Sequence, residues 1–73
     1  MKVKIRLDTM SDVKHLVHVA CNVEEDVVIY DTAGIRVNAK SMLGALYAME
    51  FNEVWCESKA DIYKELEPLV ILE

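Results

Sequence analysis

The order of apolar patterns along this chain predicts an α+β fold with the element sequence βαββαβα. Four short segments alternate apolar and polar residues, as half-buried strands do, and three segments repeat apolar residues at helical spacing. Because each element has one apolar side to bury, we expect three helices to cover one face of a four-stranded sheet. The other face of the sheet is then open. A chain of 73 residues, 53% of them hydrophobic, predicts one domain over residues 1–73.

Two different periods predict the first strand and the first helix. Residues 2–7 alternate lysine or arginine with valine, isoleucine or leucine, which predicts a strand with one basic face. The helix after it has one apolar stripe, formed by Val13, Leu16, Val17, Ala20 and Cys21. Thr9 or Ser11 is expected to cap the start of this helix. Asn22, a residue that tolerates the left-handed conformation, is expected to end it.

The middle of the chain predicts a β-hairpin followed by a short helix. Residues 26–30 form a β-branched run that is too short for a helix, and residues 35–39 alternate apolar and polar side chains. The loop between them ends in Gly34, which can adopt a positive φ, so the two runs are typical of a hairpin. Residues 42–49 then predict an apolar helix, and Ser41 before them is a preferred N-cap residue.

The last strand and the last helix are predicted at the end of the chain. Residues 53–57 alternate, with Val54 and Cys56 on the side expected to face the core. Ser58 is expected to cap the following helix, in an approximate capping box with Asp61. Pro68 disfavours a helix interior, so this helix is expected to stop or kink just before it.

Composition and charge exclude several classes of function. Eight basic and 13 acidic residues give a net charge of −5, which disfavours nucleic acid as a partner because phosphate binding needs a basic stripe. No apolar run is long enough for a membrane span, and the start of the chain lacks the apolar core of a signal peptide. We therefore expect a cytoplasmic protein in which Cys21 and Cys56 are reduced, buried apolar residues.

Residues 37–44, Val-Asn-Ala-Lys-Ser-Met-Leu-Gly, closely resemble the segment around the regulatory serine of HPr. HPr is the small phosphocarrier of the bacterial sugar phosphotransferase system. The order of elements resembles that family more loosely over nearly the whole chain. The resemblance implies an HPr-like open-faced sandwich with a four-stranded antiparallel sheet of order 1-4-2-3.

The second hallmark of the HPr family, a His-Ala-Arg-Pro segment with the phosphoryl-accepting histidine, is missing. Met10 stands at the position of that histidine and Asp12 at the position of the arginine. A thioether is no phosphoryl acceptor of this kind, and a carboxylate repels a phosphoryl group. We therefore expect no phosphohistidine carrier activity and no enzyme activity. The alternative is a working phosphocarrier that uses a displaced histidine, His15 or His18.

Ser41 is the candidate for regulatory phosphorylation, while its plainer interpretation is a helix cap alone. The resemblance implies an arrangement like that of Crh-type proteins, which keep the serine, have lost the histidine and signal carbon status to a transcription factor. The expected partners are therefore a phosphotransferase-system kinase or regulator. Lys40 would add a nearby cation for the phosphate. If the family geometry holds, the Asp12 carboxylate lies close to Ser41 and opposes both kinase and regulator.

A third interpretation is a docking subunit or homodimer that uses the open sheet face. If the family's strand pairing holds, Trp55 lies on this face beside Val27 and Ile29, forming an apolar patch. Lysine stems covering the patch are the competing interpretation. Met42 and Leu43, at the start of the second predicted helix, complete the set of candidate partner contacts.

Metal binding by His15, His18 and Cys21 has little support. Both histidines are predicted on the solvent side of the first helix, one turn apart, and Cys21 is predicted at the edge of the core. Solvated surface histidines explain the pattern better. The sequence therefore predicts neither a metal nor a cofactor.

Overall fold

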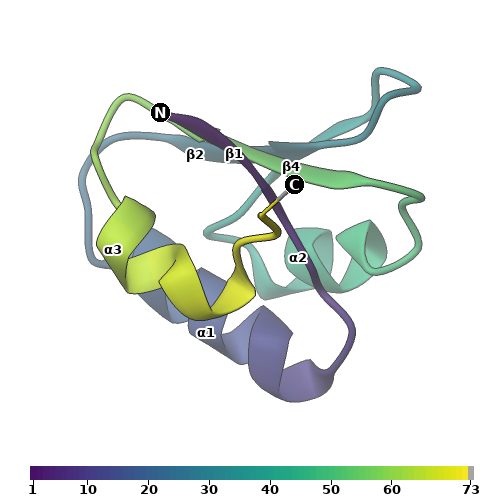
Figure 1. The fold of residues 1–73 in the computed structure, drawn as a ribbon, viewed down its shortest axis with the longest axis horizontal. Coiled ribbons are helices and arrows are strands. Elements are labelled where there is room, and N and C mark those ends of the chain that lie inside the picture. Colours follow the sequence, from purple (N-terminus) through teal and green to yellow (C-terminus); the bar gives the residue numbers. More distant parts are fainter. Residues whose placement is uncertain (73) are drawn as a thin grey trace.

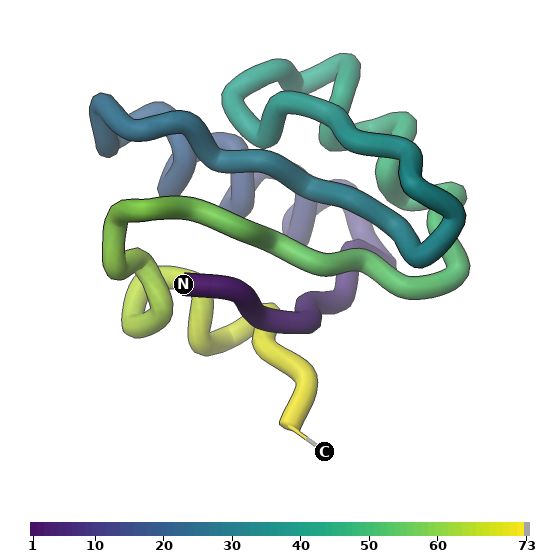
Figure 2. The backbone as a smooth tube through the Cα atoms, turned by 90° about the horizontal axis from the view of Figure 1, so that it is seen from above, coloured from purple at the N-terminus to yellow at the C-terminus, as the bar shows by residue number. Residues whose placement is uncertain are grey.

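Four strands and three helices form two layers in the computed structural model, which describes residues 1–72. The elements are β1 (Lys2–Ile5), α1 (Met10–Cys21), β2 (Val27–Tyr30), β3 (Arg36–Asn38), α2 (Met42–Ala48), β4 (Val54–Ser58), α3 (Tyr63–Leu66) and the 3-10 helix η1 (Glu67–Leu69). The helices lie together on one side of the sheet (Figure 1), and Figure 2 looks onto the opposite, open side. The predicted α+β class and element order are confirmed.

The sheet is antiparallel and has the order β1-β4-β2-β3, as the resemblance implied. Trp55 in β4 is the direct partner of Lys4 in β1 and of Tyr30 in β2. The C-terminal segment covers the outer edge of β1, because the Arg6 N–H donates to the Leu69 carbonyl at 2.9 Å and the Ile71 N–H to the Lys4 carbonyl at 3.0 Å. Among residues 1–72, β3 is therefore the edge strand whose outer side has no paired segment.

The core fills the space between the sheet and the helices. Its largest fully buried side chains are Ile5, Leu16, Ile29, Leu66, Val13, Val27 and Cys56. Cys56 is buried as predicted, and this burial raises the pKa of its thiol to about 11. The Cys56 thiol is therefore protonated at neutral pH.

The predicted orientation of β2 is wrong. Val27 and Ile29 are fully buried beneath the helices, and Val28 and Tyr30 lie on the open face instead. Directly paired residues point to the same side of a sheet, and Ile29 pairs with the buried Cys56. The β2 sequence does not alternate apolar and polar residues, so it does not show which side of the strand faces solvent. The pairing of β2 with β4 decides this.

The first helix is rotated relative to its predicted stripe. Val19 is buried, Val17 is half-buried and Cys21 is exposed, because α1 packs against both α2 and α3. Thr9 is the N-cap, in a capping box with Asp12. Asn22 is the C-terminal cap, so the predicted helix end is confirmed, but its backbone is right-handed, with a φ of −88°, and not left-handed.

The β2–β3 hairpin is confirmed. Gly34 has a φ of 97°, a conformation that favours glycine. The Asp31 carboxylate accepts hydrogen bonds from the backbone N–H groups of Ala33 at 3.0 Å and Ile35 at 3.1 Å, which closes the turn.

The predicted cap of the last helix is wrong. Ser58 is the buried last residue of β4, and its hydroxyl accepts from the Ala60 N–H at 3.1 Å. Ile62 is the N-cap residue of α3 and provides no side-chain cap, while the Asp61 carboxylate accepts from the Tyr63 N–H at 3.3 Å. As predicted, the α-helix stops before Pro68, which lies in η1.

Candidate functional site

Ser41 is the N-cap of α2, as predicted from its place before an apolar run. Its backbone is extended, and its hydroxyl oxygen accepts a hydrogen bond from the Gly44 N–H at 3.1 Å. Its carbonyl accepts from the Ala45 N–H at 2.9 Å. The half-buried hydroxyl therefore satisfies one of the N–H groups that a helix start leaves unpaired.

Gly44 allows α2 to approach the end of β3 closely. A Cβ atom at this position would lie 3.0 Å from the Asn38 carbonyl oxygen, closer than side chains normally pack. The Ser41 N–H also donates to that carbonyl, at 3.0 Å. This close contact fixes the direction in which α2 leaves the sheet, and with it the orientation of its outer face.

Lys40 does not direct its charge at Ser41. Its ammonium donates to the carbonyls of Val23 at 2.8 Å and Glu24 at 3.2 Å, which ties the loop after α1 to the start of α2. The expected role of Lys40 as a cation for a phosphate is therefore replaced by a structural one.

Asp12 serves the start of α1. Its carboxylate accepts from the backbone N–H groups of Asp8 at 2.9 Å and Thr9 at 3.1 Å. These hydrogen bonds, that from Asp8 first, hold the pKa of Asp12 below its ordinary value of 3.8.

The other end of α1 contacts the start of α2. The Cys21 thiol lies 3.7 Å from the Lys40 carbonyl. Asp12 is nine residues earlier, about 13 Å further along the helix at 1.5 Å per residue. The expectation that its carboxylate lies close to Ser41 is therefore wrong. Met10, 47% exposed, begins the same distant end of α1.

Large apolar side chains are exposed on the outside of α2. Leu43 is 78% exposed, Tyr47 52% and Met42 39%, and we call these three residues the α2 face. The Tyr47 ring contacts the Phe51 ring edge-on, with centroids 5.7 Å apart. Residues 41–49 contain no charged side chain, in a chain that is 29% charged. Met42 and Leu43 are thus exposed where the sequence analysis placed candidate partner contacts.

Sequence reasoning missed Tyr47, although the pattern contained a signal for it. A helix that is apolar on all sides cannot bury every side against one sheet. Ala45 and Ala48 fill the buried side of α2, so its larger apolar residues must lie elsewhere. Tyr47, four residues after Leu43, lies on the same exposed side.

The open sheet face has two aromatic residues, and its own cations cover one of them. Tyr30 and Trp55 are cross-strand neighbours, both half-buried. The Lys2 ammonium lies 5.6 Å and the Arg36 guanidinium 5.1 Å from the centre of the Tyr30 ring, at cation–π distance. Long cationic side chains therefore cover this part of the sheet face, which is one of the two interpretations that the sequence allowed.

Ion pairs add to this cover. Lys4 and Glu53 are 3.4 Å apart on the β1 side, and Arg36 and Glu57 are 3.5 Å apart on the β3 side. With Val27 and Ile29 buried, the predicted patch of these residues with Trp55 does not form. Trp55 instead lines a hollow shared with Val70 and Ile71 of the C-terminal segment.

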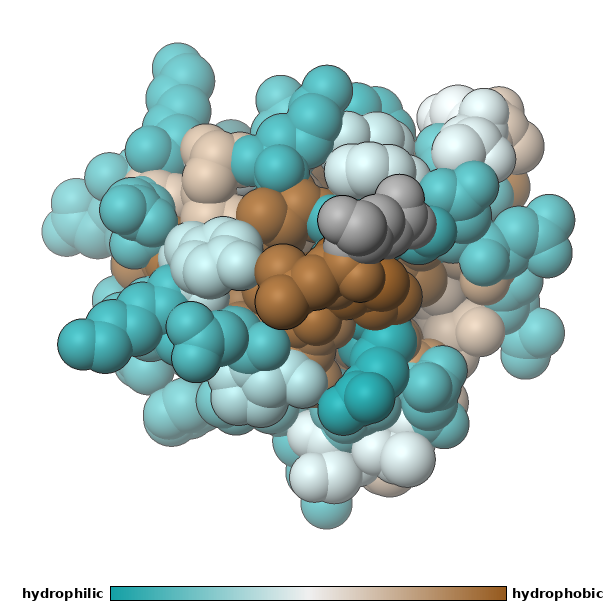
Figure 3. Space-filling view, viewed as in Figure 1, coloured by the Kyte–Doolittle hydropathy of each residue, from teal (hydrophilic) through white to brown (hydrophobic). Residues whose placement is uncertain are grey.

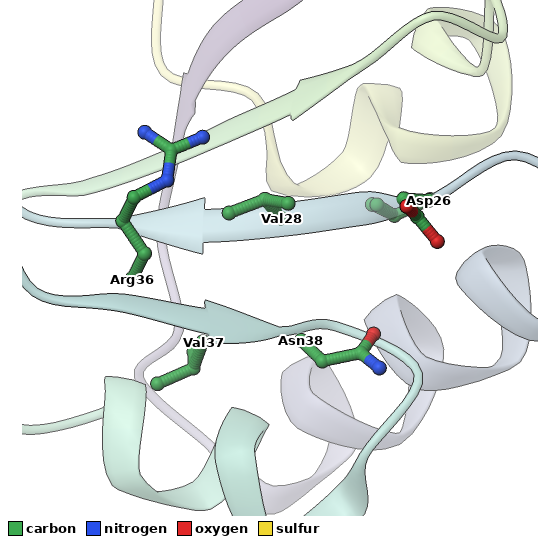
Figure 4. A pocket seen from close by; sticks show the side chains of 6 residues that line it. Asp26, Val28, Arg36, Val37 and Asn38 are labelled. Carbon is green, nitrogen blue, oxygen red and sulfur yellow. The ribbon is translucent and has the colours of Figure 1, made fainter.

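Two further surfaces lack a converging set of polar groups. A depression of about 320 Å³ crosses β2 and β3, but the Arg36 guanidinium and the Asp26 carboxylate lie at its opposite ends (Figure 4). Apolar side chains also gather near the C-terminal segment (Figure 3), where Val70 and Ile71 are half-buried and Leu72 is 84% exposed.

The two histidines lie on a groove of about 410 Å³ between α1 and α3. His15 is half-buried, with Nε2 2.7 Å from the Glu65 carbonyl oxygen, whereas the exposed His18 has Nε2 3.3 Å from the Asn22 amide nitrogen. Neither histidine is at the start of α1. Within residues 1–72, no three histidine, cysteine, aspartate or glutamate side chains are grouped to hold a metal ion.

Comparison with protein-family models, with curated proteins and with solved structures finds no match for this chain. None of the described helices has the length and apolar character needed to cross a membrane. The likeness of residues 37–44 to the HPr serine segment therefore stays a resemblance. The candidate site of the described chain is the α2 face, with Ser41 at its N-terminal end.

Proposed function

We propose that this chain is an HPr-like protein-binding module without phosphohistidine carrier activity. It docks a partner protein through the α2 face and is regulated by phosphorylation of Ser41. The observation that carries the docking function is the exposure of Met42, Leu43 and Tyr47 within nine consecutive uncharged residues. Centres of protein interfaces are depleted in charge and enriched in tyrosine and methionine, as this surface is.

The start of α1 supports the proposed lack of phosphotransfer. A phosphoryl relay needs an imidazole nucleophile and a cation beside free helix N–H groups. Met10 offers a thioether, and Asp12 places a carboxylate in the first turn of α1, where the relay would need a cation. Incubation with a phosphotransferase-system enzyme I and phosphoenolpyruvate should leave the chain unlabelled. Acid-labile phosphate on His15 or His18 would favour the displaced-histidine carrier instead.

Phosphorylation of Ser41 would change the edge of the docking surface. A phosphate adds a charge of about −1.5 to −2 where the native helix start is neutral. The expected outcome with an HPr-type kinase and ATP is one phosphate on the peptide containing Ser41, measured by mass spectrometry. Ser41→Ala should accept none. An unmodified native chain removes the regulatory part of the proposal.

Site-specific photo-crosslinking in the host cell tests the docking part. Benzoylphenylalanine in place of Leu43 should give a discrete adduct of higher mass. The same group in place of Thr32, an exposed residue of the hairpin, is the matched control and should give none. Loss of the Leu43 adduct in a Tyr47→Ser background would support the α2 face as the contact, whereas equal adducts at both positions would refute it.

A further inference from the structure

Exposed carboxylates stand at both ends of the α2 face. Glu24 and Glu25 belong to the loop that Lys40 ties to the start of α2, because the Lys40 ammonium binds the Glu24 carbonyl. Glu50 directly follows Met49, the C-terminal cap of α2. All three glutamates are exposed.

Few cations belong to α2 or to the helix that contacts its start. The ammonium of the half-buried Lys40 donates to two backbone carbonyls. Lys14 is exposed and lies two turns before Cys21, on the side of α1 that meets α2. Residues 23–25 and 40–50 thus supply three exposed carboxylates, and the one cation among them, Lys40, is half-buried.

The open sheet face carries little of the net negative charge. Its cations Lys2, Lys4 and Arg36 are accompanied by Glu53 and Glu57, which form ion pairs with Lys4 and Arg36. Most of the net charge of −5 therefore lies elsewhere on the chain.

We propose that the occupant of the α2 face is a partner protein with an apolar centre and a basic rim, and that it is not a second copy of this chain. This inference rests on the proposed docking function and names the chemistry of the partner. A basic rim would face Glu24, Glu25 and Glu50 and speed the encounter. Two copies meeting through α2 would bring these carboxylates together, which disfavours a homodimer.

Three synthetic amphipathic helices of about 15 residues serve as probes. They share the same leucine positions, and their polar positions are all lysine, all glutamine or all glutamate. In NMR titrations of the ¹⁵N-labelled chain, the lysine peptide should shift the amide signals of residues 42–47. It should bind about ten-fold more tightly than the glutamine peptide at low salt, with the difference shrinking at about 0.5 M salt. The glutamate peptide should bind most weakly.

Variants separate the possible outcomes. The triple variant Glu24→Gln, Glu25→Gln, Glu50→Gln should remove the preference for lysine but keep binding of the glutamine peptide. Glu67→Gln, which neutralises an exposed carboxylate in η1, should change neither. Leu43→Ser should abolish binding of both peptides.

The alternative results contradict different claims. Equal affinity for the lysine and glutamine peptides at residues 42–47 overturns the basic rim and leaves the docking function standing. Absence of shifts at these residues with every peptide contradicts both. If the peptides shift amide signals outside residues 42–47 and the triple variant leaves these shifts unchanged, the inference is also overturned. A dimer seen in analytical ultracentrifugation and dissociated by Leu43→Ser would overturn it as well.

Discussion

The α2 face and the open sheet face both present a tyrosine to solvent, but their neighbours differ. Tyr30 on the sheet lies beneath the Lys2 ammonium and the Arg36 guanidinium. Tyr47 on α2 has an aromatic contact with Phe51 and no charged residue within its helix. The sheet therefore covers its tyrosine with its own cations, while the helix leaves its apolar residues for a partner.

The secondary structure explains this difference. On a sheet, each residue has cross-strand neighbours, so basic residues on β1 and β3 can reach the Tyr30 ring on β2. On α2, the neighbours are residues three and four positions away, and these are apolar or small. Exposed apolar area alone thus does not identify a docking surface, because nearby long side chains decide whether it stays accessible.

The largest expected effect tests which side of β2 is open. Ile29→Ala should destabilise the chain by about 2–5 kcal/mol, because it removes a fully buried side chain between sheet and helices. Val28→Ala on the open side should cost about 1 kcal/mol or less. Urea unfolding of both variants measures the difference. Equal losses would reverse the assignment of the two faces.

The cap of α2 should have the next largest effect. Ser41→Ala removes the acceptor of the Gly44 N–H and should cost about 1 kcal/mol. Ser41→Asp keeps a cap acceptor and should retain most of the stability, which can be followed by thermal unfolding. If Ser41→Ala leaves the stability of the chain unchanged, the contact with β3 alone orients the α2 face.

The cover of the sheet face should contribute less. A double-mutant cycle with Lys4→Gln and Glu53→Gln should give a coupling of about 0.5–1 kcal/mol. The pair Arg36 and Glu57 should give about 0.2 kcal/mol, because the Arg36 side chain is 54% exposed and that of Lys4 only 22%. Couplings near zero for both pairs would mean that ion pairs do not hold the cover in place.

The smallest effect concerns pH and lies outside both surfaces. Because the pKa of Asp12 is lowered in the folded chain, its carboxylate stabilises the fold above the ordinary value of 3.8, and this contribution is lost as pH falls through the lower folded pKa. Asp12→Asn should flatten the acid side of the stability profile while leaving the α2 face and its peptide binding unchanged. If Asp12→Asn leaves the loss of stability at acid pH unchanged, other carboxylates cause that loss.

The sequence by itself determined the elements and their order, and several of their ends. Thr9, Ser41 and Pro68 act through backbone groups a few residues away, and Gly34 acts through its own φ, so local chemistry was sufficient to predict them. The motif at residues 37–44 likewise pointed to Ser41 as a helix start.

Only the tertiary structure decided which side each ambiguous element buries and which residues become neighbours. Pairing with β4 turned Val27 and Ile29 inward, and packing against two helices exposed Cys21 at the end of α1. Contact between that end and the start of α2 separated Asp12 from Ser41. These features depend on contacts between residues distant in sequence, and apolar periodicity shows that a face is buried without showing what it is buried against.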